Sequence, residues 1–369
     1  MTATATRPKA SSTTLTIPRT ELLQAVQAAS KAISRGPKPV LTYVKIGNGL
    51  VTGTDLEVRI DVAIGEMCDP CLVPADRLLS ILRAATGDTV TLKATGSGVA
   101  ITCGGGKWQL PTEDVNEYPT WEPAEMKPVC RLPADQFARA VKATVYATDN
   151  ETSRFALGGV LIDVTGGNPT WVGTDGRRMA TVETETDQAV DDSQTVVPAR
   201  VLRIAAGMAS GDGSVQVEAN SHECRLELDG VTVTGRLIEG RFPRWRDVMG
   251  DPEGSASVVS TADLIGAVRA AAIVTSEQSK GITLKWAGDT LTLSAQSSEH
   301  GESLVKCPML QAGDAADTKL DPHFLEQYLA NLPPDEEPQV DIYAQDAQSR
   351  VLLRCGPYTG VIMPLAGDA

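Results

Sequence analysis

The sequence predicts an α+β protein of three similar domains, each with two helices packed on antiparallel sheets. Two observations predict this fold class. The stretch 53–60, GTDLEVRI, returns as GTDGRRMA at 173–180, about 120 residues later. The segments that follow, 72–79 and 196–202, again match, because both carry Val-Pro-Ala ahead of a leucine. A period of this length is too large for one solenoid turn and fits a duplicated domain.

The first third of the chain shows one full cycle of helix, three strands, helix and three strands. The stretch 20–34 has apolar residues at helical spacing and stops at the glycine and prolines of 36–39. A second helix at 75–85 begins behind a proline and ends before a glycine. The expected strands lie at 14–18, 42–46, 50–52, 57–64, 90–94, 98–103 and 107–110, and the proline-containing stretch 111–123 is expected to be a connector.

The cycle returns twice more. In the second third, Phe137, Val141 and Val145 recur every four residues in a helix expected at 133–148. In the last third, Ser260 is expected to cap a helix that has Asp263 in its first turn and runs to about 274. The remaining helices are expected at 199–208 and 321–332, a connector begins at 242–245, and the strands lie at 157–164, 170–172, 179–184, 214–218, 224–228, 231–237, 281–286, 290–295, 303–307, 339–343, 351–355 and 359–363.

These elements define the expected domain boundaries. We expect a disordered tail at 1–13 and three domains at 14–127, 128–253 and 254–369. Each third can itself be divided into two similar halves, because the helix and its three strands occur twice in it.

Composition places the chain among ordinary globular proteins. Its 369 residues are 42% hydrophobic but only 4% aromatic, so the cores must consist mainly of Leu, Ile, Val and Ala. No apolar run approaches the length of a membrane span, and the tail lacks the continuous apolar segment of a secretory signal. Seven cysteines are an odd and scattered set, which disfavours a disulfide framework and favours a cytoplasmic protein.

Cys68 and Cys71 have the C-x-x-C spacing of redox motifs and of half a zinc site. A structural zinc site needs four ligands, and the histidines His222, His300 and His323 supply no second pair at suitable spacing. The favoured interpretation is two cysteines that flank a turn before a helix. We therefore expect no metal and no cofactor.

The charge is unevenly distributed. The net charge is −14, yet the six predicted helices sum to about +3, which leaves about −17 for the rest of the chain. A basic helical layer inside an acidic protein suits a surface that meets phosphate on one face only. A general preference of exposed helix faces for Lys and Arg explains the same numbers, so charge alone leaves both interpretations open.

The sequence offers little support for an enzyme. Asp55 and Asp175 are the candidates for a hydrolytic acid, but they recur at matching places beside a threonine, as turn-forming residues do. The glycine-rich stretch 104–107 is not a P-loop, because Trp108 stands where Ser or Thr is required. No G-x-S-x-G or H-E-x-x-H motif occurs. We predict no catalytic residue, and a multidomain interaction scaffold that works without DNA is a rival function.

Over roughly residues 14–365 the chain resembles the bacterial DNA polymerase III beta subunit, the sliding-clamp family. The resemblance is carried, in order, by GTDLE at 53–57, ATD at 147–149, LGGVL at 157–161, TDGRRMA at 174–180, GRFPRW at 240–245, AAAIV at 270–274 and GVIMPL at 360–365. It implies the DNA-clamp fold, with two chains joined head to tail into a ring whose hole is lined by helices. One implied partner is double-stranded DNA, which the closed ring holds by topology and without sequence readout. The other implied partners are the replicative polymerase and clamp-loader subunits, which bind through short peptides.

The resemblance also assigns three sets of residues. The partner-peptide pocket matches Leu157, Thr174, Gly176, Arg177, Arg178, Met179, Pro243, Val248, Val361, Met363, Pro364 and Leu365. The contact that closes the ring matches Lys107, Trp108, Leu110, Ile273, Val274, Glu299 and Glu302, with burial of Trp108 in its own domain as the alternative. The candidates for facing DNA are Lys31, Arg35, Lys38, Arg77, Arg83, Arg139, Lys142, Arg200, Arg203 and Arg269.

Two positions depart from the family pattern. Asp247 stands where many relatives carry a basic residue, and the ending 366–369, AGDA, replaces a short basic ending. Both departures bear on which peptide motif the pocket prefers and how tightly it binds.

Overall fold

The computed structural model describes residues 14–33, 38–121, 124–149, 156–186, 188, 190–276, 280–333 and 338–365. The tail 1–13, Arg35 and the ending 366–369 lie outside the described residues.

Within the described residues the same order, strand, helix and three strands, occurs six times. The first and second copies are β1 (Thr14–Pro18), α1 (Arg19–Ala29), β2 (Tyr43–Gly47), β3 (Leu50–Thr54), β4 (Val58–Ala63), and β5 (Cys71–Pro74), α2 (Ala75–Ala84), β6 (Thr89–Thr95), β7 (Gly98–Cys103), β8 (Gly106–Leu110). The third and fourth are β9 (Lys127–Pro133), α3 (Ala134–Val145), β10 (Gly159–Val164), β11 (Pro169–Thr174), β12 (Arg178–Glu183), and β13 (Ser193–Pro198), α4 (Ala199–Ala206), β14 (Ser214–Ala219), β15 (Glu223–Leu228), β16 (Val231–Arg236). The fifth and sixth are β17 (Ser257–Ser260), α6 (Thr261–Ala272), β18 (Ile282–Ala287), β19 (Thr290–Ser297), β20 (Gly301–Pro308), and β21 (Thr318–Leu320), α7 (Pro322–Asn331), β22 (Gln339–Ala344), β23 (Val351–Cys355), β24 (Tyr358–Ile362).

All six predicted helices are present, and Ser260 caps α6 by accepting a hydrogen bond from the backbone nitrogen of Asp263 at 3.4 Å. The leading strands β5, β9, β13, β17 and β21 were not predicted. Four leading strands of the six copies, β1, β5, β9 and β13, end in a proline, which favours a helix start. The short helix α5 (Trp245–Met249) also lies where only a connector was expected.

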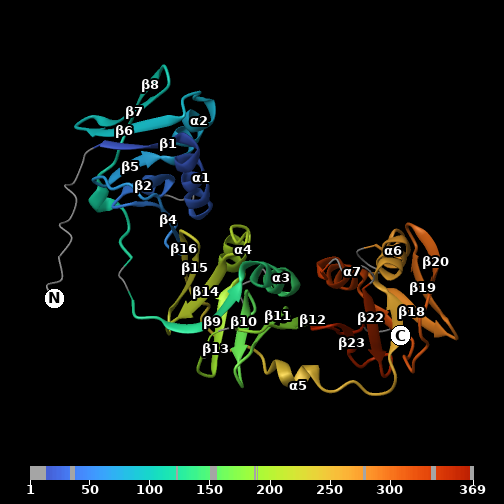
Figure 1. The fold of residues 1–369 in the computed structure, drawn as a ribbon. Helices are drawn as coiled ribbons and strands as arrows, with labels where there is room; N and C mark the ends of the chain where they lie inside the picture. The colour runs from blue at the N-terminus through green and yellow to red at the C-terminus, as the bar shows by residue number, and fades with distance from the viewer. Residues whose placement is uncertain are drawn as a thin grey trace. The chain divides into compact units, whose positions relative to one another are not determined.

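The chain forms two compact units. The first unit contains residues 1–128 and 207–237, and the second contains residues 129–206 and 238–369. In the first unit, α1 packs against α2, and the strands form a four-stranded sheet β1-β6-β7-β8 and the run β5-β2-β3-β4-β16-β15-β14 of a longer sheet (Figure 1).

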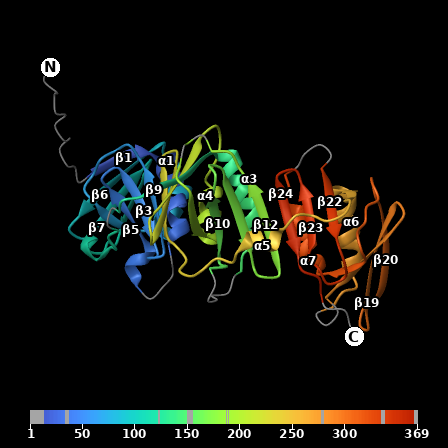
Figure 2. The same ribbon diagram turned by 90° about the horizontal axis from the view of Figure 1, so that it is seen from below.

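The second unit has a long sheet and a short one. The long sheet has the order β13-β10-β11-β12-β24-β23-β22-β17, and the short one has the order β20-β19-β18-β21. Helix α3 packs against α4, and α6 packs against α7 (Figures 1 and 2). The main apolar core of this unit lies between α6, α7 and the strands behind them, around Leu264, Leu293 and Leu325. The domain boundaries expected from the sequence stay predictions.

Neighbouring copies exchange their leading strands. Strand β1 pairs with β6 of the second copy, and β5 pairs with β2 of the first. The same exchange joins β17 to β22 and β21 to β18. The long sheets arise where last strands meet, because β4 pairs with β16 and β12 pairs with β24, both antiparallel.

The repeated glycines have a packing role. A Cβ atom on Gly53 would lie 2.1 Å from the carbonyl oxygen of Ala29 at the end of α1. A Cβ atom on Gly173 would lie 2.2 Å from the carbonyl oxygen of Thr144 near the end of α3. Glycine is therefore required at both places, because the helix end touches the strand backbone. This contact fixes the turn that follows each glycine.

Candidate functional site

The second copy of the repeated turn is built around Asp175. Its Oδ1 atom accepts hydrogen bonds from the backbone nitrogens of Arg177 at 2.9 Å and Arg178 at 3.0 Å. The hydroxyl of Thr174 accepts from the backbone nitrogen of Gly176 and donates to the carbonyl of Arg178. Gly176 has φ of 86°, a conformation that glycine adopts without strain. These bonds hold the turn in one conformation at the start of β12.

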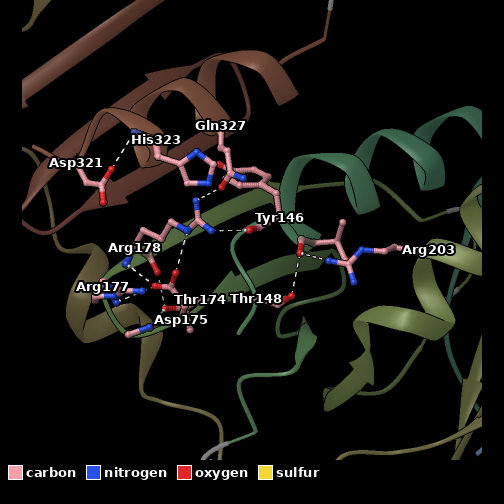
Figure 3. Close-up of polar contacts among 12 residues, drawn as sticks. Tyr146, Thr148, Thr174, Asp175, Arg177, Arg178, Arg203, Asp321, His323 and Gln327 are labelled. Atoms are coloured by element: carbon pink, nitrogen blue, oxygen red, sulfur yellow. Dashed lines mark hydrogen bonds and ion pairs between the residues drawn. The ribbon is translucent and has the colours of Figure 1, made fainter. Parts of the chain in front are cut away.

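Arg178 joins this turn to two helices (Figure 3). Its Nε donates to Asp175 at 3.0 Å, its Nη2 to the carbonyl of Tyr146 at 2.8 Å, and its Nη1 to the side chain of Gln327. The guanidinium also lies 4.4 Å from the ring centre of Phe324 on α7. Three of its nitrogens are therefore engaged within the protein, and the side chain connects β12 with the end of α3 and with α7.

Apolar side chains cover the outer face of the long sheet in the second unit, the face away from the helices. Leu161, Val172, Met179, Leu352 and Val361 form one buried cluster there, and Trp245 of α5 packs over it. The connector thus covers part of an apolar sheet face, and the predicted pocket residues Met179 and Val361 lie beneath it, 4% and 1% exposed.

A buried carboxylate fixes the connector. Asp163 on β10 is fully buried and accepts hydrogen bonds from Trp245 Nε1 at 2.8 Å and from Arg246. It also accepts from Thr165 at 2.7 Å and from Gln194 at 3.1 Å. Burial alone would raise the pKa of Asp163, but the donors Arg246, Thr165 and Trp245 hold this pKa below its ordinary value. Asp163 therefore stays charged and binds α5 to the sheet.

The predicted pocket residues divide by exposure. Met363 and Val248 present apolar surface, with 42% and 41% of each residue exposed. Met363 is held in place because its backbone nitrogen donates to the carbonyl of Arg177 at 2.9 Å. Of the remaining predicted pocket residues, Gly176 and Arg177 are exposed, Arg178, Pro243, Pro364 and Leu365 are half-buried, and Leu157 and Thr174 are buried. We call the surface formed by Met363, Val248, Pro243 and the turn 174–177 the slot.

A cleft of about 480 Å³ lies beside α5. It is lined by Leu161, Gln194, Val196 and the connector residues 240–247. Pro243 belongs to both the slot and this cleft. Asp247, which departs from the family pattern, forms an exposed ion pair with Arg244 at 3.1 Å.

The predicted DNA-facing residues that the structure describes are all exposed. Arg139, Arg203 and Arg269 are among those engaged within the second unit. Arg139 pairs with Asp135, Arg269 pairs with Glu326 at 2.8 Å, and Arg203 donates to the carbonyl of Val145 at 3.2 Å. Because the pairs are exposed, they hold these side chains only weakly and leave them able to meet phosphate.

The residues predicted to close the ring lie on β8, directly after α6, in the turn between β19 and β20, and on β20. Lys107 is exposed on β8, whereas Trp108 and Leu110 are half-buried there. The Trp108 ring lies over Gly106, because a Cβ atom on that glycine would fall 2.1 Å from the ring. Ile273 at the end of α6 is 78% exposed, whereas Val274 packs partly against the core. Glu299 and Glu302 are exposed next to Leu304 of β20, an apolar residue that is 68% exposed and was not predicted.

Cys68 and Cys71 are free and buried. Burial, followed by the effect of the Cys68 thiol, raises the pKa of Cys71 to about 12, so its thiol is protonated and unreactive at neutral pH. Among the described residues no group of three or more His, Cys, Asp or Glu is placed to hold a metal ion. No helix in the described part of the chain has the length and apolar character needed to cross a membrane.

Two family models match this chain. The model of the DNA polymerase III beta subunit N-terminal domain matches residues 13–122, and that of its central domain matches residues 131–244. The two matches together cover more than half of the 369 residues. The chain belongs to the DNA polymerase III beta-subunit family.

Relatives and solved structures of this family agree with that assignment. The beta sliding clamp of Pseudomonas putida is 27% identical over 353 residues, which cover 92% of this chain and 95% of the relative. The beta sliding clamp of Escherichia coli K12 is 25% identical over 300 residues, or 78% of this chain and 82% of the relative. Crystal structures of the sliding clamps from Pseudomonas aeruginosa and Bacillus subtilis share the fold, each with a TM-score of 0.88 over 96% of this chain, at 24% and 21% identity.

Sequence reasoning missed several residues that shape this family site. Asp163 and Gln194 anchor the connector, and Trp245 covers the apolar face. A signal for Asp163 was present, because a lone aspartate interrupts the apolar strand 160–164. Such a residue must find partners when it is buried. No comparable signal marked Gln194.

Proposed function

We propose that this chain is a DNA sliding clamp, a non-catalytic processivity subunit. Two copies close head to tail into a ring around duplex DNA, and the ring tethers the replicative polymerase and other partners that carry short peptide motifs. The observation that carries the proposal is how the last strand of each copy is paired. Strands β4 and β16 pair, and so do β12 and β24, whereas β8 and β20 are left at sheet edges among the described strands.

An unpaired edge strand is a template for pairing with another chain. Each existing junction joins the last strand of an odd copy to the last strand of an even copy. Strand β8 ends the second copy and β20 ends the fifth, so a β8–β20 pair between two chains would repeat the same rule. Two such pairs, related by head-to-tail symmetry, close a ring of two chains.

The junction geometry predicts the register of this pair. Val62 pairs with Val231, and Val182 pairs with Tyr358, which are the first residues of β16 and β24. Val62 and Val182 each lie two residues beyond the partner of the close-packed glycine. We align Ala295 of β19 with these glycines, because its partner Ser303 contacts the carbonyl of Ala271 near the end of α6, and the matching residue of β20 is then Val305. We therefore expect Gly106 opposite Val305, which places Lys107 opposite Leu304 and Trp108 opposite Ser303.

Disulfide cross-linking tests the ring and its register together. Directly opposed residues have Cβ atoms within reach of a disulfide, whereas positions two residues apart do not. The double variant Lys107→Cys with Leu304→Cys should form a covalent two-chain ring, and Lys107→Cys with Lys306→Cys should not. The natural cysteines do not interfere because all seven are buried. Sedimentation of the unmodified chain should give twice the chain mass of 38.9 kDa, and negative-stain images should show an open-centred ring.

A chain that stays monomeric at high concentration and shows compact particles without a hole would exclude the ring. Equal cross-linking of both cysteine pairs would reject the register while leaving the ring intact. The expected ring also predicts retention on nicked circular DNA after assembly around it, with release when the DNA is linearised.

The helices supply the inner surface of the proposed ring. Sequence-independent sliding needs weak phosphate contacts and no base readout. The exposed cations on α2, α3 and α4, which include Arg77, Lys142 and Arg200, suit this role. Acting on DNA places the protein inside the cell, and we assign it to the cytoplasm.

The slot is the proposed site for partner peptides. Met363 follows the buried Val361 of the apolar sheet face by two residues, and Val248 lies on α5, whose Trp245 covers that face. Apolar anchors of a peptide bind such a surface, and the polar turn 174–177 gives the peptide its direction. The unbranched Met363 side chain can repack for different partners.

A further inference from the structure

The cleft beside α5 has a floor and a rim of opposite character. Leu161 and Val196 form an apolar floor, and Phe242 adds an aromatic wall. The rim carries Arg241 and Arg244 together with Arg246. With Asp247 as the acidic residue of the lining, the lining has a net charge of +2, and the buried carboxylate of Asp163 paired with Arg246 lowers the charge of the site to +1. The whole chain has a net charge of −14, so this basic site stands out from its surroundings.

The three arginines are held to different degrees. Arg246 is 50% exposed at its side chain and is bound on one side by the buried Asp163. Arg244 makes a single exposed ion pair with Asp247. Arg241 is exposed and has no ion-pair partner among the described residues. One guanidinium is thus fixed in advance, and another is available for a ligand.

We propose that this cleft binds acidic residues that flank the apolar anchors of a partner peptide. The inference rests on the proposed function of the slot and adds a subsite to it. The connector links the two sites, because Pro243 of the slot lines the cleft and Val248 of the slot follows Asp247 of the cleft. We expect an extended peptide to leave the slot along the connector and to reach the cleft.

The chemistry of the cleft matches such a segment. An arginine guanidinium offers paired donors that fit both oxygens of a carboxylate. The apolar floor binds the methylene groups of a glutamate or a neighbouring apolar side chain. Arg246 is already placed by Asp163, which lowers the entropy lost when the peptide binds. The peptide exchanges the weak Arg244–Asp247 pair for a carboxylate of its own.

Three labelled peptides test the proposal by fluorescence anisotropy with the full chain. The first contains only Leu and Phe anchors in a neutral sequence, the second adds three Glu residues at its N-terminus, and the third adds them at its C-terminus. Because exposed ion pairs contribute about 0.2–1 kcal/mol each, one acidic extension should tighten binding about threefold to tenfold. The gain should shrink as salt rises, because the pairs are solvent-exposed.

Variants locate the effect. Arg241→Glu should abolish the gain from the acidic extension and leave the affinity for the neutral peptide within about twofold. Arg236→Glu on β16 of the first unit is the matched control, because it reverses an exposed arginine outside the cleft. It should leave all three peptides unchanged.

The outcomes separate this inference from the proposed function. Binding of the neutral peptide with no gain from either extension would overturn the cleft proposal alone. Failure of all three peptides to bind would overturn the slot and the cleft together. A labelled single-stranded oligonucleotide serves as the rival ligand. If Arg241→Glu weakens binding of the oligonucleotide but not the acidic peptide, the cleft is a phosphate site and the proposal is wrong.

Discussion

The two long sheets have the same architecture and opposite outer faces. In the first unit, Arg59 pairs with Asp61 at 2.7 Å and Arg225 lies 3.6 Å from Glu218. In the second unit the corresponding face is apolar and buried beneath the connector. Each residue of the first turn corresponds to the residue 120 positions later in the second turn, and the strand pairing extends this match to the neighbouring strands. The matched pairs are Lys45 and Leu161, Thr52 and Val172, Arg59 and Met179, Arg225 and Leu352, and Thr234 and Val361.

This difference explains how a duplicated framework can present the proposed slot on one of its two long sheets. The glycines, the aspartate turn and the strand pairing that build the junction are the same in both sheets. What changed is the side chains that point away from the helices. The polar part of the first outer face satisfies itself with ion pairs, and only its end at Tyr43 and Leu72 is covered by an apolar cluster with Tyr118. The apolar face of the second sheet must be covered by the connector or by a partner.

The largest loss of stability should come from substitution of the residue that differs most between the two turns. Val58 of the first turn corresponds to Arg178 of the second. Arg178→Ala removes a guanidinium whose ion pair with Asp175 is only 9% exposed on each side. We expect a loss of about 3 kcal/mol in unfolding free energy, at the low end for a broken buried pair because Asp175 keeps its backbone hydrogen bonds.

Hydrogen exchange of the full chain should localise this loss to β12 and α7. The matched variant Val58→Ala removes two methyl groups from a buried site, so it should cost about 1–2 kcal/mol and loosen the first unit instead. Equal protection of α7 before and after Arg178→Ala would show that the arginine does not connect the two elements.

The next largest loss of stability should come from removal of a carboxylate from the outer face of a long sheet. Asp163→Ala leaves the indole nitrogen of Trp245 without its acceptor, which should cost about 2 kcal/mol and increase hydrogen exchange in 245–249. Asp61→Ala is the control from the first sheet. Its carboxylate is partly exposed, so its ion-pair partner Arg59 can turn to water and the loss should stay below about 1 kcal/mol. A larger loss for Asp61 than for Asp163 would contradict this order.

The same carboxylate predicts a pH dependence. The pKa of Asp163 in the folded protein is lower than in the unfolded chain, where it lies near about 3.9. Its contribution to stability is therefore fully present above the unfolded pKa and is lost as pH falls through the folded one. Acid should loosen the connector of the wild-type chain below about pH 4, and Asp163→Asn should remove this part of the pH dependence. Exchange in 245–249, followed from pH 6 to pH 3, measures both.

The sequence was sufficient to predict the helices, hairpins and turns, but not to predict which residues of the sheet faces are exposed. The helices and hairpins were predictable because their periodicity is local, and the turns at Asp55 and Asp175 were predictable because they repeat. The leading strands other than β1 were missed because each pairs with the other half of its domain, a contact that local spacing does not encode. Met179 is covered by Trp245, which lies 66 positions later in the sequence. The sequence pattern around Met179 therefore does not show whether this residue is exposed or buried.

A reciprocal exchange tests whether one exposed residue decides binding. Met363 and Arg236 are equivalent, because each donates its backbone N–H to the carbonyl of the fourth turn residue, Arg177 or Glu57. Met363→Arg should weaken binding of the neutral Leu and Phe peptide about tenfold, since it places a charge against the apolar anchors. The melting temperature should hardly change, because Met363 is 42% exposed. Arg236→Met should create no binding, because the surface beneath it is polar, and binding by this variant would contradict the comparison.

The smallest effect should come from the third residue of each turn. Leu56 has φ of 81°, where its counterpart Gly176 has φ of 86°. A side chain in this left-handed region costs about 1–2 kcal/mol, and the extra freedom of glycine in the unfolded chain returns about 0.5–1 kcal/mol of that cost. Leu56→Gly should therefore stabilise the chain by about 0.5–1 kcal/mol, and Gly176→Leu should destabilise it by a similar amount. Denaturant titration of both variants measures the pair. A loss of stability in Leu56→Gly would mean that the leucine, which is 37% exposed, gains more from its contacts than its backbone conformation costs, and that the first turn has an apolar role of its own.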